Sequence, residues 1–251
     1  MTLLNIAGYR FADLDRLPER RQALTALGLQ LGLRGTILLA PEGINVFACG
    51  EPPAVRELLA ALRTDPALAD LTAKESWSAT TSFGHWRVRE KREIITFRQP
   101  GLRPHDARAD AVAPATLRRW LARGSDDEGR PLALIDTRNE FEVQAGSFEG
   151  ALDLGLRSFT DLPAAVQARR GELAGRRLVT FCTGGIRCEK AALWMTQAGF
   201  EHVTQLDGGI LNWFEREGGA HWHGHCVVFD RRGTLRPDLS AEFDGDLPAA
   251  A

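Results

Sequence analysis

Short apolar runs alternate with helix-like segments throughout the second half of the chain. The runs "LALIDTR", "LVTFC" and "HVTQLDGG" are typical of buried strands, and each precedes a segment with helical periodicity. The helices are predicted at Asn139 to Ala145, Glu189 to Ala198 and Ile210 to Glu217, and "ATLRRWLARG" predicts a further short helix before the first of these strands. Strands that alternate with helices favour an α/β domain in which helices cover both faces of a parallel sheet.

The first half of the chain has a different order of elements. A strand at "LLNIAGYRF" leads into a helix over Pro18 to Leu33, and the β-rich runs around Pro41-Glu42-Gly43 predict a hairpin. A helix over Pro53 to Arg63 follows, and then strands at Glu75 to Ala79 and at His85 to Phe97. The order β-α-β-β-α-β predicts a ferredoxin-like sandwich, with helices on one face of an antiparallel sheet.

The passage "RQPGLRPHDARADAVAP" separates these two patterns and has no sustained apolar period. We therefore expect a ferredoxin-like domain at 1–98, a linker at 99–114, a parallel-sheet domain at 115–224 and a C-terminal extension at 225–251. A chain of 251 residues suits this division, because domains commonly contain ~100–200 residues.

Composition excludes several classes of protein. The net charge of −2 and the pI near 6.3 give no global basic character, so contact with nucleic acid would need a local patch. Charged residues appear too early for a secretory signal, and no run of ~18 apolar residues could cross a bilayer. We expect a cytoplasmic protein without membrane contact, whose four cysteines remain thiols.

The stretch "VTFCTGGIRCEKAALWM" carries the strongest functional signal. Cys182 follows a predicted strand at its carboxyl end, where ligands bind in parallel sheets. The loop that follows it consists of Thr183, Gly184, Gly185, Ile186 and Arg187. The glycines allow backbone N–H groups to curl inward, while the arginine and a helix predicted to begin near Cys188 add positive charge. These features predict a nucleophilic thiolate in an anion cradle; the alternative is a structural cysteine in a tight turn.

Three further residues lie near this loop in the predicted fold. Cys188 is either a thiol that resolves an oxidised Cys182 by forming a disulfide, or a small side chain that packs the start of the helix. Asp136 and Arg138 follow the strand "LALI" and form either an electrostatic shell at the sheet edge or a structural ion pair. The ion pair is the preferred interpretation, because a partly buried arginine commonly needs a carboxylate partner.

Two other patterns raise a metal or an RNA interpretation. His221, His223, His225 and Cys226 are possible zinc ligands, but their spacing matches no usual zinc finger, and a strand with surface histidines explains them more simply. The segment "HWRVREKREIITFR" interleaves basic residues with Trp86 and Phe97. It predicts either a phosphate-tracking strand with aromatic residues for base stacking or a charged, solvated edge strand.

Several of these motifs resemble the rhodanese-like domains. "CTGGIR" is similar to their active-site loop, whose cysteine carries a persulfide, and "DTRNEFEVQAGSFEGA" and "LDGGI" resemble their upstream signature and late strand and turn. The six residues from Cys182 to Arg187 match the sulfurtransferase form of the loop, whereas the related phosphatases have one residue more. The resemblance therefore disfavours phosphatase activity.

Together with "GTILLAPEGIN" and "CVVFDRR", these motifs resemble the oxygen-dependent tRNA uridine hydroxylases over nearly the full length. That resemblance implies an N-terminal ferredoxin-like domain and a rhodanese domain, 5-hydroxylation of the wobble uridine, the tRNA anticodon region as partner, molecular oxygen as co-substrate and Cys182 as the catalytic residue. No flavin, haem or iron-ligand pattern is evident, so neither a cofactor nor a metal is expected. The alternatives are a thiosulfate-type sulfurtransferase with a persulfide at Cys182, or a non-catalytic RNA- or sulfide-binding module.

Overall fold

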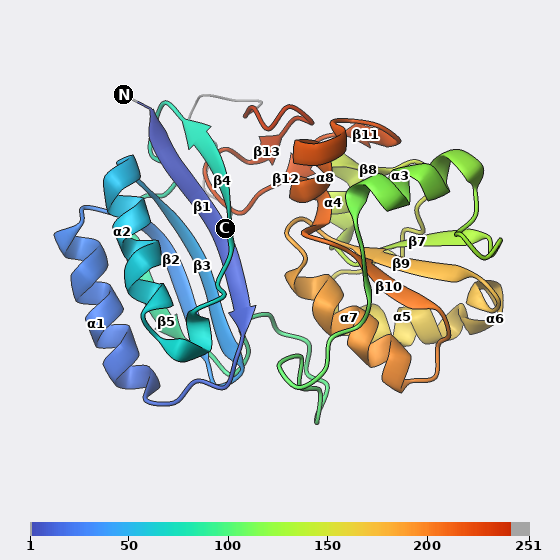
Figure 1. The fold of residues 1–251 in the computed structure, drawn as a ribbon, viewed down its shortest axis with the longest axis horizontal. Coiled ribbons are helices and arrows are strands. Elements are labelled where there is room, and N and C mark those ends of the chain that lie inside the picture. Colours follow the sequence, from blue (N-terminus) through green and yellow to red (C-terminus); the bar gives the residue numbers. More distant parts are fainter. Residues whose placement is uncertain (1, 242–251) are drawn as a thin grey trace. The chain divides into compact units, whose positions relative to one another are not determined.

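The computed structural model describes residues 2–241, which fold into two compact units (Figure 1). The first unit contains the chain up to Thr96 together with Phe229–Gly233, and the second contains Phe97–Val228 and Thr234–Leu239. Residues 242–251 of the expected C-terminal extension lie outside the described residues.

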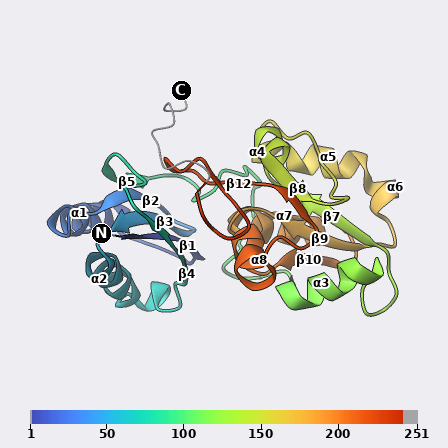
Figure 2. The same ribbon diagram turned by 90° about the horizontal axis from the view of Figure 1, so that it is seen from above.

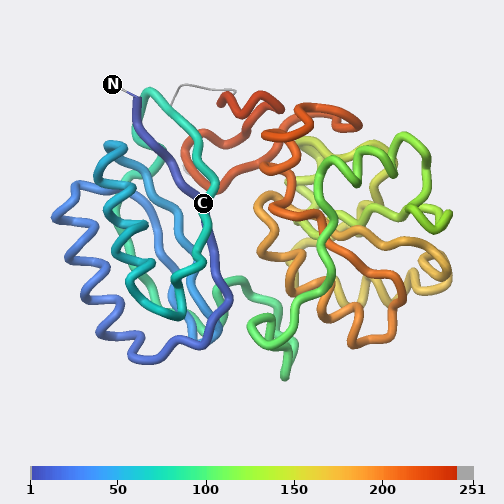
Figure 3. The backbone as a smooth tube through the Cα atoms, viewed as in Figure 1, coloured from blue at the N-terminus to red at the C-terminus, as the bar shows by residue number. Residues whose placement is uncertain are grey.

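The first unit is a five-stranded sheet with two helices on one face, built in the order β-α-β-β-α-β and followed by a further strand. Its elements are β1 (Leu3–Phe11), α1 (Leu17–Gln30), β2 (Arg34–Ala40), β3 (Gly43–Gly50), α2 (Pro52–Arg63), the 3₁₀ turn η1 (Pro66–Leu68), β4 (Ala73–Ser78) and β5 (Trp86–Glu90). The strand order is β4-β1-β3-β2-β5, and only the β2–β5 pair is parallel. Figure 3 shows the first strand in dark blue beside β4 in teal, although the two are far apart in sequence. The predicted ferredoxin-like order is confirmed.

The core of this unit follows from the periodicity of its elements. Alternate residues of β1, such as Leu4 and Ile6, are buried, and the helical spacing of α2 buries Val55, Leu58 and Leu62 in the same cluster. The hairpin between β2 and β3 depends on Gly43, whose φ is 148° and whose added Cβ would lie 2.1 Å from a backbone oxygen. The glycine in the predicted turn is therefore required by both conformation and space.

The strand predicted at His85 to Phe97 is wrong in length, since β5 ends at Glu90. Its neighbour β2 ends at Ala40, and the N–H of Lys91 makes the last bond, 2.8 Å, to the carbonyl of Leu39. Beyond that point β2 offers no further backbone groups, so the chain leaves the sheet. Sequence pattern alone does not reveal where a partner strand ends.

The second unit contains a parallel four-stranded sheet in the order β6-β10-β9-β7. Its elements are β6 (Ala111–Val112), α3 (Pro114–Arg123), β7 (Leu132–Asp136), α4 (Glu140–Ala145), β8 (Gly146–Phe148), η2 (Phe159–Asp161), α5 (Leu162–Ala168), α6 (Arg170–Leu173), β9 (Arg177–Phe181), α7 (Ile186–Gln197), β10 (Val203–Leu206), α8 (Gly209–Glu217), β11 (Trp222–Gly224), β12 (Cys226–Val227) and β13 (Thr234–Leu235). Figure 2 shows α3 and α8 on one face of the sheet and α5 and α7 on the other, which confirms the predicted layers.

Two features of this unit have no strong sequence signal. The passage expected to be a linker ends in β6, a two-residue strand that pairs with β10, and a strand this short has no detectable period. Two small antiparallel pairs, β8 with β11 and β12 with β13, form separate two-stranded sheets outside the main sheet. The ring of Phe148 in β8 packs edge-on against Phe181 of β9 and Trp222 of β11, with centroid separations of 4.9 and 5.2 Å.

Candidate active site

Cys182 lies directly after β9, and its side chain is fully buried. The N–H of Gly185, whose φ is 99°, donates a hydrogen bond of 3.1 Å to the Cys182 Sγ. The helix α7 begins at Ile186 rather than near Cys188, so its start was predicted too late. As a result Arg187 lies in the first turn, where N–H groups have no partner within the helix.

The surroundings of this sulfur favour its charged form. Burial by itself raises the pKa of Cys182, but the Cys188 thiol, the charge of Arg187 and the backbone N–H groups of these two residues together lower that pKa to about 5. The sulfur is therefore a thiolate at neutral pH, although no solvent touches it in this conformation. It faces peptide N–H groups rather than an apolar wall.

The carbonyl groups of the loop point away from the sulfur, toward the start of α8. The N–H of Ile210 donates to the carbonyl of Cys182 at 2.9 Å, and that of Leu211 donates to Thr183 at 3.0 Å. Gly209 makes this approach possible, because an added Cβ would lie 2.4 Å from the carbonyl oxygen of Cys182. The glycines of "LDGGI" are the sequence signal for this contact.

The outer side of the loop is open. Thr183, Gly184 and Ile186 are partly exposed, whereas Gly185 and Arg187 are buried. No heavy atom lies within 4 Å of the position that a Cβ on Gly184 would occupy. A ligand that approaches the sulfur would therefore meet the backbone at Gly184 first.

Sequence reasoning missed Glu142, a buried residue of α4. Its carboxylate accepts hydrogen bonds from both terminal nitrogens of Arg187, at 2.6 and 2.8 Å, and a third from the N–H of Asn139 at 3.0 Å. The positive charge of Arg187 is thus paired with a buried carboxylate, which also fixes the guanidinium in place. The available signal was the arginine itself, because a buried guanidinium requires a carboxylate partner.

Asp136 and Arg138 form a buried two-pronged ion pair, with N···O distances of 2.9 and 2.7 Å. Arg138 also donates to the carbonyls of Glu142 and Gly146 at 3.3 and 2.6 Å, and Ser147 donates to Asp136 at 2.8 Å. These bonds tie the end of β7 to α4 and β8. The geometry corresponds to the structural interpretation of the pair.

The two other cysteines of this unit are protonated. Burial, together with the hydrogen bond and the charge of Cys182, raises the pKa of Cys188 well above its ordinary value, and its Sγ lies 3.8 Å from the Thr137 Oγ1. Burial likewise raises the pKa of Cys226 to about 12, and its thiol donates to the Thr183 Oγ1 at 3.8 Å. None of the four cysteines forms a disulfide.

The histidine-rich segment does not form the predicted strand face. The strand β11 covers only Trp222–Gly224, and His221 before it has a positive φ of 55°. Within residues 2–241, the single group of three possible ligands with adjacent donor atoms is Asp13, His105 and Asp106, which does not include these histidines.

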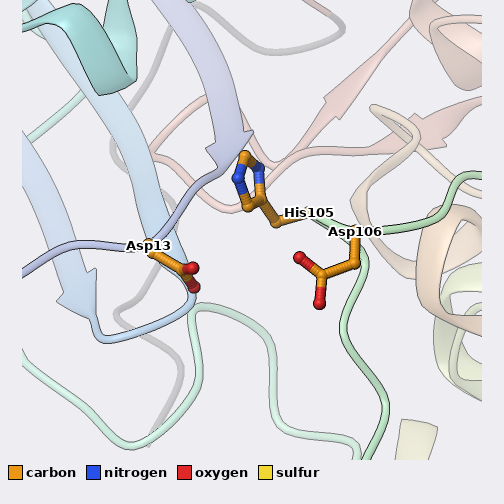
Figure 4. Close-up of side chains that lie close together, drawn as sticks. All are labelled: Asp13, His105 and Asp106. Carbon is orange, nitrogen blue, oxygen red and sulfur yellow. The ribbon is translucent and has the colours of Figure 1, made fainter.

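Asp13, His105 and Asp106 are exposed (Figure 4). Asp13 belongs to the first unit, whereas His105 and Asp106 belong to the second. Exposed acidic groups commonly lie near one another without a metal ion, so we assign no metal site to these residues.

Of the two interpretations of the segment around Trp86 and Phe97, base stacking by these aromatic residues does not fit the structure. Trp86 packs in the core of the first unit and donates to the carbonyl of Leu24 at 3.1 Å, while Phe97 is buried and stacks on Phe159 at a centroid distance of 4.4 Å. Arg87 and Arg89 remain exposed on the edge strand β5.

Within residues 2–241, no helix has the length and apolar character needed to cross a bilayer.

A parallel sheet with a six-residue cysteine loop at its carboxyl edge defines a rhodanese-like domain, and the rhodanese-like domain model matches residues 115–216. The model described as UPF0176 acylphosphatase like domain matches residues 3–94. The chain is 55% identical to the tRNA uridine(34) hydroxylase of Variovorax paradoxus, with 95% of this chain and 91% of that protein covered. The corresponding protein of Thiobacillus denitrificans is 54% identical, with 95% and 96% covered. This chain belongs to the tRNA uridine(34) hydroxylase family.

Proposed function

We propose that this protein hydroxylates uridine 34 of tRNA at C5, with Cys182 as the reactive group. The observation that supports this most directly is a buried thiolate in a backbone N–H cradle, in a chain 55% identical to a tRNA uridine(34) hydroxylase over 95% of its length. We assign uridine 34 as the substrate because the relatives are named for it, and we assign Cys182 as the reactive group because of the chemistry of the site. The protein acts in the cytoplasm, on the anticodon region of tRNA.

The cradle stabilises negative charge where the reaction takes place. The N–H groups of Gly185, Arg187 and Cys188 converge on the sulfur, and such preorganised donors stabilise developing charge strongly in a buried site. Molecular oxygen is the proposed co-substrate. One oxygen atom of O₂ converts C5–H into C5–OH, and the other leaves as water. This reaction requires two electrons and two protons from a donor.

The first unit offers a surface for the RNA backbone. Arg87 and Arg89 are exposed on the edge strand β5, and guanidinium groups pair with phosphate oxygens. We assign them contacts to tRNA phosphates rather than to bases, because the neighbouring Trp86 is buried.

The test is complementation in a bacterial strain that lacks every route to wobble-uridine hydroxylation, followed by mass spectrometry of tRNA nucleosides. The wild-type chain is expected to restore 5-hydroxyuridine-derived nucleosides, and Cys182→Ser is not. Cys49→Ala, which removes a thiol from β3 in the first unit, is the matched control and is expected to restore them. Soluble wild-type protein that leaves tRNA unhydroxylated would overturn the proposal.

A second candidate function is sulfur transfer through a persulfide at Cys182. The six-residue loop and the lowered pKa of the cysteine favour it, because a thiolate attacks the outer sulfur of thiosulfate. The full chain would then consume thiosulfate and cyanide catalytically and carry one extra sulfur on Cys182. Failure of both measurements excludes this candidate and leaves hydroxylation untouched.

A further inference from the structure

The first unit has helices on only one face of its sheet. Figure 2 shows α1 and α2 on the same side of this sheet, where they pack on the core cluster that contains Leu4, Ile6 and Ile37. Side chains alternate between the two faces along a strand, so the residues between these core positions lie on the opposite face. We call that face the open face, and its central residues are Ala7, Tyr9, Thr36, Leu38 and Phe47, all of which are partly exposed.

The strand register brings two aromatic rings together on the open face. Phe47 of β3 lies opposite Ala7 of β1 and Thr36 of β2. Tyr9 of β1 lies opposite Asn45, two residues before Phe47 in β3, so Tyr9 and Phe47 are diagonal neighbours. Diagonal neighbours on adjacent antiparallel strands are about 7–8 Å apart, within reach of aromatic side chains. Because β1 and β3 are interior strands, the two rings lie near the middle of the sheet.

Positive charge flanks the two rings. Arg87 of the edge strand β5 pairs in register with Thr36, and Lys74 of the opposite edge strand β4 pairs with Ala7. Both cations therefore lie on the open face, as does Arg89 two residues beyond Arg87. Among the described residues of the five strands, those on this face include no acidic residue, and its cations are Arg34, Lys74, Arg87 and Arg89.

The acidic residues of the same strands lie on the helix side. Glu75 pairs with Ile6, and Glu90 pairs with Leu39, and both partners belong to the core. The whole chain has a net charge of −2, so the positive charge of the open face does not follow from composition. It arises from the way in which the strands divide their charged residues between the two faces.

A ligand of the open face must match both its charge and its rings. Single-stranded RNA does so, because its phosphate oxygens pair with guanidinium groups and its unstacked bases stack on aromatic side chains. Double-stranded RNA does not, since its bases are stacked on one another inside the duplex. The face is therefore complementary to an RNA loop.

We propose that the open face binds the single-stranded loop of the tRNA anticodon, with bases stacked on Tyr9 and Phe47 and phosphates bound by Arg87 and Arg89. This inference rests on the proposed function for the identity of the RNA, and it adds the residues that hold the bases. The base contacts come from the interior strands β1 and β3, whereas the edge strand β5 supplies the phosphate contacts.

The first test is the affinity of the full chain for a fluorescein-labelled anticodon stem-loop, measured by anisotropy at several salt concentrations. Tyr9→Ala and Phe47→Ala are each expected to weaken binding by about 5- to 100-fold, which corresponds to the loss of one stacked base. The slope of log K against log salt should remain that of the wild type, because stacking releases no counterions. Tyr9→Phe keeps the ring and should bind as tightly as the wild type.

Trp77→Ala is the matched control. Trp77 is an aromatic residue of the edge strand β4 with an exposed fraction of 50%, but it pairs in register with Leu4 and so lies on the helix side. This variant is expected to bind the stem-loop with unchanged affinity. Thermal unfolding of each variant checks that it is folded.

Photochemical cross-linking tests the same contacts without any substitution. Anticodon stem-loops that carry 5-iodouridine at one loop position at a time are irradiated with the wild-type chain, and the cross-linked peptides are sequenced by mass spectrometry. The expected result is a cross-link to Tyr9 or Phe47 from at least one loop position. Unlabelled anticodon stem-loop should suppress it, and a duplex of the same length should not.

The outcomes separate this inference from the proposed function. Unchanged affinity in both alanine variants, or cross-links confined to other residues, would overturn the role of the open face and leave hydroxylation standing. A wild-type dimer that Tyr9→Ala dissociates in sedimentation would overturn it as well, because a second copy of the chain would then cover the face. Normal binding and cross-linking by a chain that restores no hydroxylated nucleoside would overturn the proposed function alone.

Discussion

The carboxylate of Glu142 binds both terminal nitrogens of Arg187, at 2.6 and 2.8 Å, in a site that is almost closed to solvent. Glu142 comes from α4 and Arg187 from the first turn of α7, so this pair joins the two helices that border the cysteine loop. It also keeps the guanidinium in place beside the sulfur. The electrostatics of Cys182 therefore depend on a residue forty positions upstream of it.

Replacement of Glu142 tests this arrangement. Glu142→Gln leaves the buried guanidinium without a charged partner, and the free energy of unfolding is expected to fall by about 3–5 kcal/mol, as when one member of a buried ion pair is removed. Urea denaturation measures the change. Glu140→Gln, on the exposed side of the same helix, is the control and should stay within about 0.5 kcal/mol of wild type. Equal stabilities of the two variants would contradict the role of the pair.

The charge of Cys182 gives a prediction for pH. Its pKa lies near 5 and below that of an ordinary thiol, so the thiolate is present above pH 5 and is lost as the pH falls through that value. The ultraviolet absorbance of thiolate in the native protein should show one transition near pH 5. Cys182→Ser should lack it, and Cys188→Ala should move it upward, because the side-chain donor is gone. A wild-type transition near pH 8 to 9 would refute the cradle.

Gly209 is expected to be essential for the position of the loop. An added Cβ at this residue would lie 2.4 Å from the carbonyl oxygen of Cys182, and the φ of 65° is unfavourable for any other residue. Gly209→Ala should lower hydroxylation at least tenfold and raise the pKa of Cys182, since the loop must move.

Gly218→Ala is the matched control for that variant. Gly218 ends the same helix with a φ of 60°, and no heavy atom lies within 4 Å of its added Cβ. Alanine there carries a conformational cost of about 1–3 kcal/mol without the clash, so the variant should be less stable but active. Similar losses of activity in both variants would show that strain, and not contact with the loop, is responsible.

The edge strand β5 gives a prediction for RNA binding. If Arg87 and Arg89 each neutralise a phosphate, the double replacement by glutamine should weaken tRNA binding and lower the slope of log K against log salt by about 1.4–1.8. Arg157→Gln combined with Arg216→Gln removes two exposed charges from the second unit and serves as control. An unchanged slope in the first variant would exclude β5 from the interface.

Local pattern predicted the elements well where a single period runs through them. The helix predicted over Pro53 to Arg63 is α2, and the strand "LVTFC" is β9, with Cys182 directly after its end. The errors occur where a neighbour determines the outcome. The strand β5 stops because β2 stops, and Trp86 is buried because the core of the first unit receives it.

The residues from Cys182 to Arg187, with their paired glycines and the adjoining strand and helix, specify by themselves a cysteine loop at a sheet edge, because backbone freedom and periodicity are local properties. Only the tertiary structure decided that Glu142 pairs with Arg187 and that α8 binds the loop carbonyls. Those contacts join segments distant in the chain or depend on where a helix begins, and no local pattern encodes the distance between two atoms in the folded state.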